Sequence, residues 1–202
     1  MTKRLKAAER RASILAVAKV LFADRGFHGV SVDDIARRLG VSPAVLYRHF
    51  PSKEALYEAV LDQIAGTRES YIDAVLDGPD DFGAVLSRMT AVFVDSIAAD
   101  PDYLRMEMQA ALEHSPATTR FFEHRWKSLT DYVEFSLKEL AREGLAAHVH
   151  PLSAALMFQG IVREALYAKC IYQSEYYRDY DLDTLVARLI ELFLRAIGYR
   201  EP

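Results

Sequence analysis

The chain has 202 residues, of which 51% are hydrophobic and 27% are charged, so it can bury a sizeable core and lacks a composition typical of disorder. Its single cysteine excludes an intramolecular disulfide framework. The N-terminus is charged and no run of about 18 apolar residues exists, so we expect a cytoplasmic protein without a membrane-spanning segment or signal peptide.

The net charge of −4 is unevenly distributed along the chain. Residues 1–53 carry 11 Lys and Arg against 4 Asp and Glu, whereas residues 54–202 carry 14 against 25. A basic segment suits nucleic acid, because Lys and Arg displace the counterions of phosphates. The acidic remainder would confine nonspecific DNA contact to the basic segment. This asymmetry indicates a DNA-binding head on an acidic body.

Three short helices are predicted within the basic segment. The first ends at Gly26 and has one apolar face, made of Ile14, Leu15, Ala18, Leu21 and Phe22. The second begins at Ser31, with Asp34 in capping-box spacing, and stops at Gly40, where a residue that tolerates positive φ is favoured. The third is short, with Ser42 as N-cap and Pro43 at its first position.

A helix, a turn containing glycine and a second helix form the helix-turn-helix plan, whose second helix enters the major groove of DNA. Leu46 and Phe50 are predicted to point inward from this second helix, and Tyr47, Arg48 and His49 outward. The first helix would pack across the other two. We therefore predict a three-helix head with a core of its own.

Turn and cap residues predict six further helices and no strand, which makes the protein all-α with about nine helices. Their predicted extents are Lys53 to about Leu76, Asp80 or Asp81 to about Ala99, Asp100-Pro101 to about His114, Ser115-Pro116 to Glu143, His150-Pro151 to about Gln173, and Asp181 to Gly198.

Three sequence runs resemble the TetR family of bacterial transcriptional regulators: Leu39-Gly40-Val41-Ser42, Leu46-Tyr47-Arg48-His49-Phe50 and Ser52-Lys53-Glu54-Ala55-Leu56. The close resemblance covers residues 14–56. It implies an N-terminal helix-turn-helix domain over residues 1–53 and a larger helical effector-binding and dimerisation domain over residues 54–202. The helix that begins at Lys53 would connect the two as a lever.

The resemblance also implies which residues contact DNA. Pro43, Ala44 and Arg48 would face base edges, and only Arg48 could make a bidentate contact to guanine. Tyr47, His49 and Lys53 would contact phosphates, although Tyr47 and His49 could instead pack against the fourth helix. The complete predicted set is Ser31, Arg38, Ser42, Pro43, Ala44, Val45, Tyr47, Arg48, His49 and Lys53. Asp33 departs from the pattern, since it would oppose a nearby phosphate.

The last two helices have unusually wide apolar faces, and the helix over residues 152–172 is apolar nearly all round. Such a helix is either a central core helix or, as the resemblance implies, part of a four-helix bundle with a second copy. A half-site reader needs two copies to bind a palindromic operator, so we favour the homodimer.

The body is predicted to bind a small apolar or aromatic effector through Met106, Phe122, Trp126, Met157 and Phe158, with Arg163, or else Arg105, Glu107 or Gln109, as a polar anchor. Large apolar side chains at helical spacing are also ordinary core residues. The sequence contains none of the common catalytic or phosphate-binding motifs, and its histidines lack the spacing of metal ligands. We therefore expect no enzyme, metal or cofactor.

These observations predict a homodimeric repressor that a small effector releases from its operator. Two alternatives stay open. In one, the effector strengthens DNA binding or the protein activates transcription. In the other, the body binds a protein partner and no small molecule.

Overall fold

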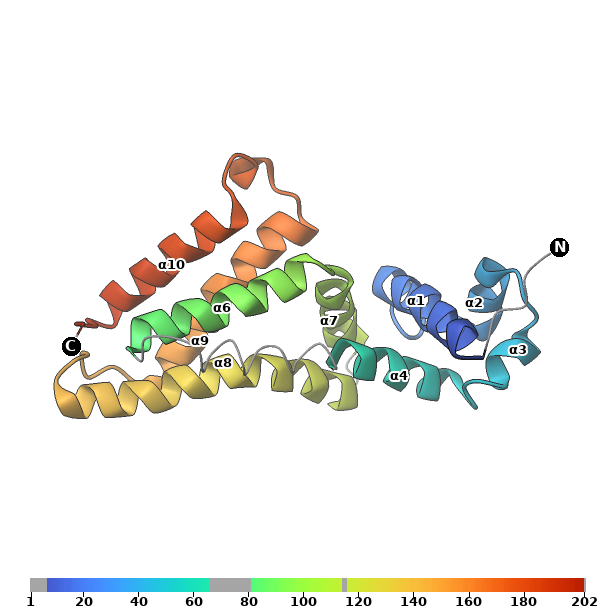
Figure 1. The fold of residues 1–202 in the computed structure, drawn as a ribbon, viewed down its shortest axis with the longest axis horizontal. Coiled ribbons are helices and arrows are strands. Elements are labelled where there is room, and N and C mark those ends of the chain that lie inside the picture. Colours follow the sequence, from blue (N-terminus) through green and yellow to red (C-terminus); the bar gives the residue numbers. More distant parts are fainter. Residues whose placement is uncertain (1–6, 66–80, 114–115, 202) are drawn as a thin grey trace. The chain divides into compact units, whose positions relative to one another are not determined.

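The computed structural model describes residues 7–65, 81–113 and 116–201. Two compact units divide the chain: Met1–Thr67 with Asp102–Phe121, and Arg68–Pro101 with Phe122–Pro202. The described residues form nine α-helices, one π-helical segment and one 3-10 turn, with no strand among them, so the all-α prediction is confirmed (Figure 1). None of the individual helices in the described ranges combines the length and the hydropathy that a membrane span requires.

The first unit contains α1 (Ala7–Arg25), α2 (Val32–Leu39), α3 (Pro43–Tyr47), α4 (Lys53–Ala65) and α7 (Asp102–Glu113). Helix α1 packs on α2, α4 and α7, and its five predicted core residues are buried. Phe22, Phe27 and Tyr57 form an aromatic cluster that fixes α4 to α1, with the rings of Phe22 and Tyr57 4.9 Å apart and edge to face. The head therefore has its own core, as the sequence predicted.

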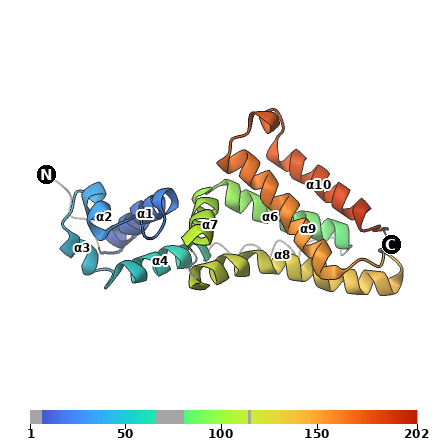
Figure 2. The same ribbon diagram turned by 180° about the vertical axis from the view of Figure 1, so that it is seen from behind.

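The second unit contains α6 (Phe82–Ala98), most of α8 (Pro116–Glu143), α9 (Pro151–Leu166) and α10 (Leu182–Ala196). Figure 2 shows α9 and α10 side by side, and both also pack on α6. Phe158 of α9 meets Phe193 of α10 with ring centroids 4.9 Å apart, and Phe93 of α6 meets Trp126 of α8 at 4.6 Å. One aromatic pair thus joins α9 to α10, and another joins α6 to α8.

Several predicted helix starts are confirmed by capping hydrogen bonds, but Ser42 precedes α3 without a side-chain cap bond, and α7 begins at Asp102 rather than at the predicted Pro101. The carboxylates of Asp81 and Asp181 accept backbone N–H bonds at the first turns of α6 and α10, and the ring of His150 accepts one at the start of α9. Helix α9 ends at Leu166, but the π-helical segment Tyr167–Ile171 continues it close to the predicted end. The predicted cap at Ser115 and the end of the fourth helix lie outside the described residues.

Candidate nucleic-acid interface

A complete capping box begins α2. The Ser31 hydroxyl accepts the Asp34 N–H at 3.1 Å, and the Asp34 carboxylate accepts the Ser31 N–H at 3.1 Å. Asp34 also pairs with Arg37 at 2.9 Å. The hydrogen bonds from Ser31 are the main reason that the pKa of Asp34 is lowered. Ser31 is thus primarily a cap, because its own N–H and hydroxyl are both engaged, and its predicted phosphate contact stays a prediction.

The turn between α2 and α3 has the geometry that the sequence predicted. Gly40 adopts φ 66°, a left-handed conformation that glycine tolerates without steric cost, and the Val41 N–H returns to the Ala36 carbonyl at 3.0 Å. Leu46 and Phe50 then anchor α3 through side chains that are 1% and 5% exposed. The short helix is therefore held firmly by its inner face.

The outer face of α3 carries most of the predicted DNA-binding side chains. Ala44, Tyr47 and Arg48 are exposed, whereas Pro43, Val45 and His49 are half-buried. Tyr47 is 54% exposed, which argues against the alternative that it packs into the protein, while half-buried His49 fits that alternative better. Arg38 and Ser42 are exposed beside α3, as is Asp33 in the first turn of α2.

Lys53 has a role that the sequence did not indicate. Its ammonium donates to the carbonyls of Phe27 and Val30, each at 3.0 Å, and lies 4.1 Å from the centre of the Phe27 ring. These contacts tie the first residue of α4 to the loop between α1 and α2. An ammonium has three protons, so one remains for a phosphate, and that predicted contact stays a prediction.

Arg11 is a candidate DNA contact that sequence reasoning missed. It lies in α1, yet its guanidinium is 4.9 Å from the ring centre of Phe50, just beyond α3. The side chain is exposed, so a cation is held beside the end of the reading helix. The sequence signal was weak, because Arg11 is only one of several basic residues near the N-terminus.

The six predicted effector residues do not form one group. Met106 is buried in the first unit, while the other five belong to the second. Trp126 is buried beneath the guanidinium of Arg163, which lies 4.9 Å from its ring centre. Phe158 packs on Phe193, whereas Met157 beside it is 43% exposed. Phe122 is buried. A shared effector site stays a prediction for all six.

Helices α9 and α10 present exposed apolar side chains. Leu152, Leu156 and Met157 on α9 and Leu192 on α10 are all more than 40% exposed. Leu152 and Leu156 are one helical turn apart, so they share one side of α9. Leu152 and Leu156 therefore form an exposed apolar strip on α9, which is a candidate interaction surface.

Comparison with known proteins agrees with the helix-turn-helix geometry. Residues 14–60 match the family described as bacterial regulatory proteins, tetR family. The nucleoid occlusion factor SlmA of Vibrio cholerae is 30% identical over 154 residues, which cover 68% of this chain and 69% of SlmA. The chain belongs to the TetR family of bacterial regulatory proteins.

Two transcriptional regulators of Mycolicibacterium smegmatis are also similar to this TetR-family protein. The activator FasR is 35% identical over 146 residues, which cover 72% of this chain and 65% of FasR. The repressor KstR2 is 30% identical over 136 residues, which cover 65% of this chain and 57% of KstR2. The chain thus matches somewhat less than two thirds of the length of these two relatives, and neither is an enzyme.

Solved structures share the fold of the whole chain. A TetR-like transcriptional regulator from Rhodococcus sp. RHA1 is 19% identical, with a TM-score of 0.76 over 98% of this chain and 100% of that one. AibR, solved in complex with isovaleryl coenzyme A and operator DNA, is 22% identical, with a TM-score of 0.67 over 95% of this chain and 100% of that one. At these identities the likeness shows the TetR-type fold alone.

Proposed function

We propose that the protein is a sequence-specific regulator that binds a palindromic double-stranded operator as a homodimer. The observation that carries this proposal is the exposed outer face of α3, where Ala44 and Tyr47 on the helix and Arg48 directly after it are exposed, while Leu46 and Phe50 are buried. A reading helix held in this way can enter the major groove, where the Arg48 guanidinium matches the O6 and N7 acceptors of guanine. We place the protein in the cytoplasm, because a regulator of this kind must have access to DNA.

Selection of bound sequences from a random DNA pool, at a stated salt concentration, tests this function. We expect a palindromic consensus from the native protein and a consensus relaxed at one position per half-site from Arg48→Ala. Arg142→Ala, which removes an exposed cation from the end of α8, serves as the control and should leave the consensus unchanged. Binding without enrichment, weakening steadily as salt rises, would leave only nonspecific phosphate attraction.

The proposed homodimer uses the exposed apolar residues of α9 and α10. Leu152, Leu156, Met157 and Leu192 would become buried against a second copy, and burial of apolar surface is the main driving force for such association. Sedimentation equilibrium tests the proposal with Leu156→Glu, which should shift the protein toward monomer. Phe135→Glu is the matched control, because Phe135 is a similarly exposed apolar residue of α8.

We propose a small apolar or aromatic effector that binds near Trp126 and releases the protein from DNA. Phe122 and Trp126 supply large apolar surfaces, and the guanidinium of Arg163 would anchor a polar group of the ligand. AibR binds isovaleryl coenzyme A, so an acyl thioester series is a sensible first panel. Trp126 is the single tryptophan, so its fluorescence would report binding directly, and Trp126→Phe would abolish that signal.

Activation of transcription is a second candidate beside repression. KstR2 is a repressor, but FasR, which is more similar in sequence, is an activator. Transcription of a reporter behind the selected operator distinguishes the two. Deletion of the gene should raise expression if the protein represses, and should lower it if the protein activates.

A further inference from the structure

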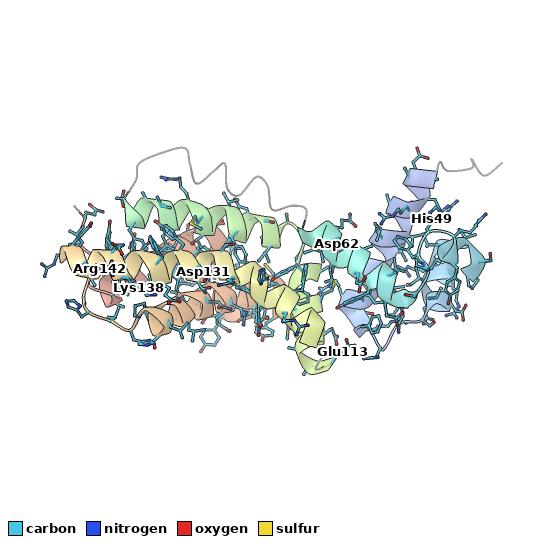
Figure 3. The ribbon with its side chains drawn as sticks, turned by 90° about the horizontal axis from the view of Figure 1, so that it is seen from below. His49, Asp62, Glu113, Asp131, Lys138 and Arg142 are labelled. Carbon is cyan, nitrogen blue, oxygen red and sulfur yellow. The ribbon has the colours of Figure 1, made fainter. Side chains whose placement is uncertain are left out.

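Glu113 at the end of α7 forms a hydrogen bond with the loop between α1 and α2. Its Oε1 accepts the backbone N–H of His28 at 3.0 Å, a bond between residues 85 positions apart in the sequence. Both residues belong to the first compact unit, in which α7 packs on α1. Figure 3 labels Glu113 at the C-terminal end of α7. The bond is charge-assisted, and such bonds are stronger than those between neutral groups.

Gly26 makes room for this carboxylate. The residue has φ +71°, which disfavours any side chain, and a Cβ atom built there would overlap Glu113 Oε1 and lie 3.2 Å from Gln109 Oε1. The sequence pattern predicts only that Gly26 ends the first helix. In the structure the same glycine also allows two side chains of α7 to approach the backbone.

The loop is held from a second helix as well. Lys53 of α4 donates to the carbonyls of Phe27 and Val30, while Glu113 accepts the N–H that lies between them in the sequence. An anion and a cation therefore bind the donors and acceptors of one short loop. The loop ends at Ser31, the N-cap of α2, so its position determines where the helix-turn-helix begins.

Helix α7 is well placed in the chain to carry a signal to this loop. It follows α6 after the three residues Ala99–Pro101, and α8 begins at Pro116, shortly after Glu113. Both α6 and most of α8 belong to the second unit. An N–H···O bond keeps good geometry only between about 2.7 and 3.2 Å, so a shift of α7 by about 1 Å along the loop would break it.

We propose that Glu113 is a positioning residue that couples the effector-binding part of the chain to the DNA-binding head through the loop between α1 and α2. This rests on the proposed regulatory function. With the bond intact, the head keeps one orientation on α4 and α7. When α7 shifts, the carboxylate releases His28, and the loop between α1 and α2 is then held by Lys53 of α4. The head can then reorient, and two heads no longer keep a fixed spacing.

Amide hydrogen exchange tests the hydrogen bond between Glu113 and His28 without any DNA or effector. In Glu113→Ala the His28 amide should exchange about ten to a hundred times faster, the range expected for loss of a hydrogen bond to a charged group. Glu113→Gln keeps an acceptor oxygen and should restore most of the protection. Asp62→Asn removes one exposed negative charge from α4 and should change nothing (Figure 3). Equal exchange in Glu113→Ala and the native protein would overturn the proposal.

Half-site spacing tests the coupling. The native protein should lose most of its affinity when one base pair is inserted between the half-sites of the selected operator. Glu113→Ala should tolerate the insertion better, so that the affinity ratio between the two DNAs falls about tenfold, whereas Asp62→Asn should keep the native ratio. Faster His28 exchange with an unchanged ratio would overturn the coupling role. A failure to select any operator would count against the proposed function, while the exchange experiment would still decide whether Glu113 protects the His28 amide.

Discussion

Replacement of Lys53 by methionine should destabilise the head while preserving the length of the side chain. The substitution removes two ammonium–carbonyl hydrogen bonds of 3.0 Å and the contact with the Phe27 ring. A hydrogen bond to a charged group contributes about 1.5–3 kcal/mol when buried. Lys53 is only half-buried, so water replaces part of that energy. We therefore expect a loss of about 2 kcal/mol in the free energy of unfolding, including about 0.5 kcal/mol from the ring contact.

Thermal unfolding followed by circular dichroism measures this loss. In a chain of this size, about 2 kcal/mol corresponds to a fall in Tm of about 4–8 °C. Lys127→Met is the matched control, because Lys127 pairs with exposed Asp131 on the surface of α8 and such pairs contribute at most about 1 kcal/mol. Equal Tm values for the two variants would refute the structural role of Lys53.

Four further predictions concern the DNA-binding head and the proposed dimer. Arg48→Ala should lose about 1–3 kcal/mol of discrimination at one base pair per half-site in competition binding, whereas an equal loss on all sequences would contradict its reading role. Arg11→Ala should weaken DNA binding equally on all sequences and reduce the slope of log K against log salt concentration by about one. An unchanged slope would exclude a phosphate contact by Arg11. Hydrogen bonds from Ser31 lower the pKa of Asp34 in the folded protein, so the ionised carboxylate stabilises the fold. This stabilisation should be complete above the unfolded carboxyl pKa of about 3.9. It should be lost as the pH falls through the lower pKa of the folded state. Thermal unfolding between pH 6 and pH 2 should show this component in the native protein but not in Asp34→Asn. Leu156→Glu should dissociate the dimer in sedimentation experiments, and a dimer that survives would move the interface elsewhere.

Features set by neighbouring residues could be predicted from the sequence. The Ser31–Asp34 capping box, the left-handed Gly40 and the caps at Asp81 and Asp181 are all confirmed, because each involves residues at most four positions apart. The core faces of α1 and α3 are also confirmed, since helical spacing determines which side chains share a face.

Features that depend on distant residues could not be predicted. Lys53 suited a phosphate contact by its position, but its bonds to Phe27 and Val30 depend on how α4 packs against a loop more than 20 residues earlier. Met157 and Phe158 have similar hydrophobic character, yet one is exposed and the other is fully buried, because consecutive helical residues point in different directions. The hydrogen bond between Glu113 and His28 likewise has no signal in the sequence near either residue, because the two are 85 positions apart. The division between residues 53 and 54 stays a prediction, and packing groups α4 and α7 with the head.

Competition binding between the selected palindrome and a scrambled duplex, measured from 50 to 200 mM salt, tests the central claim most directly. We expect the palindrome to bind at least about a thousandfold more tightly at physiological salt, as sequence-specific DNA-binding proteins do. We also expect both affinities to fall with salt, because both duplexes present the same phosphates. Equal affinity for the two duplexes at every salt concentration would contradict sequence reading by α3.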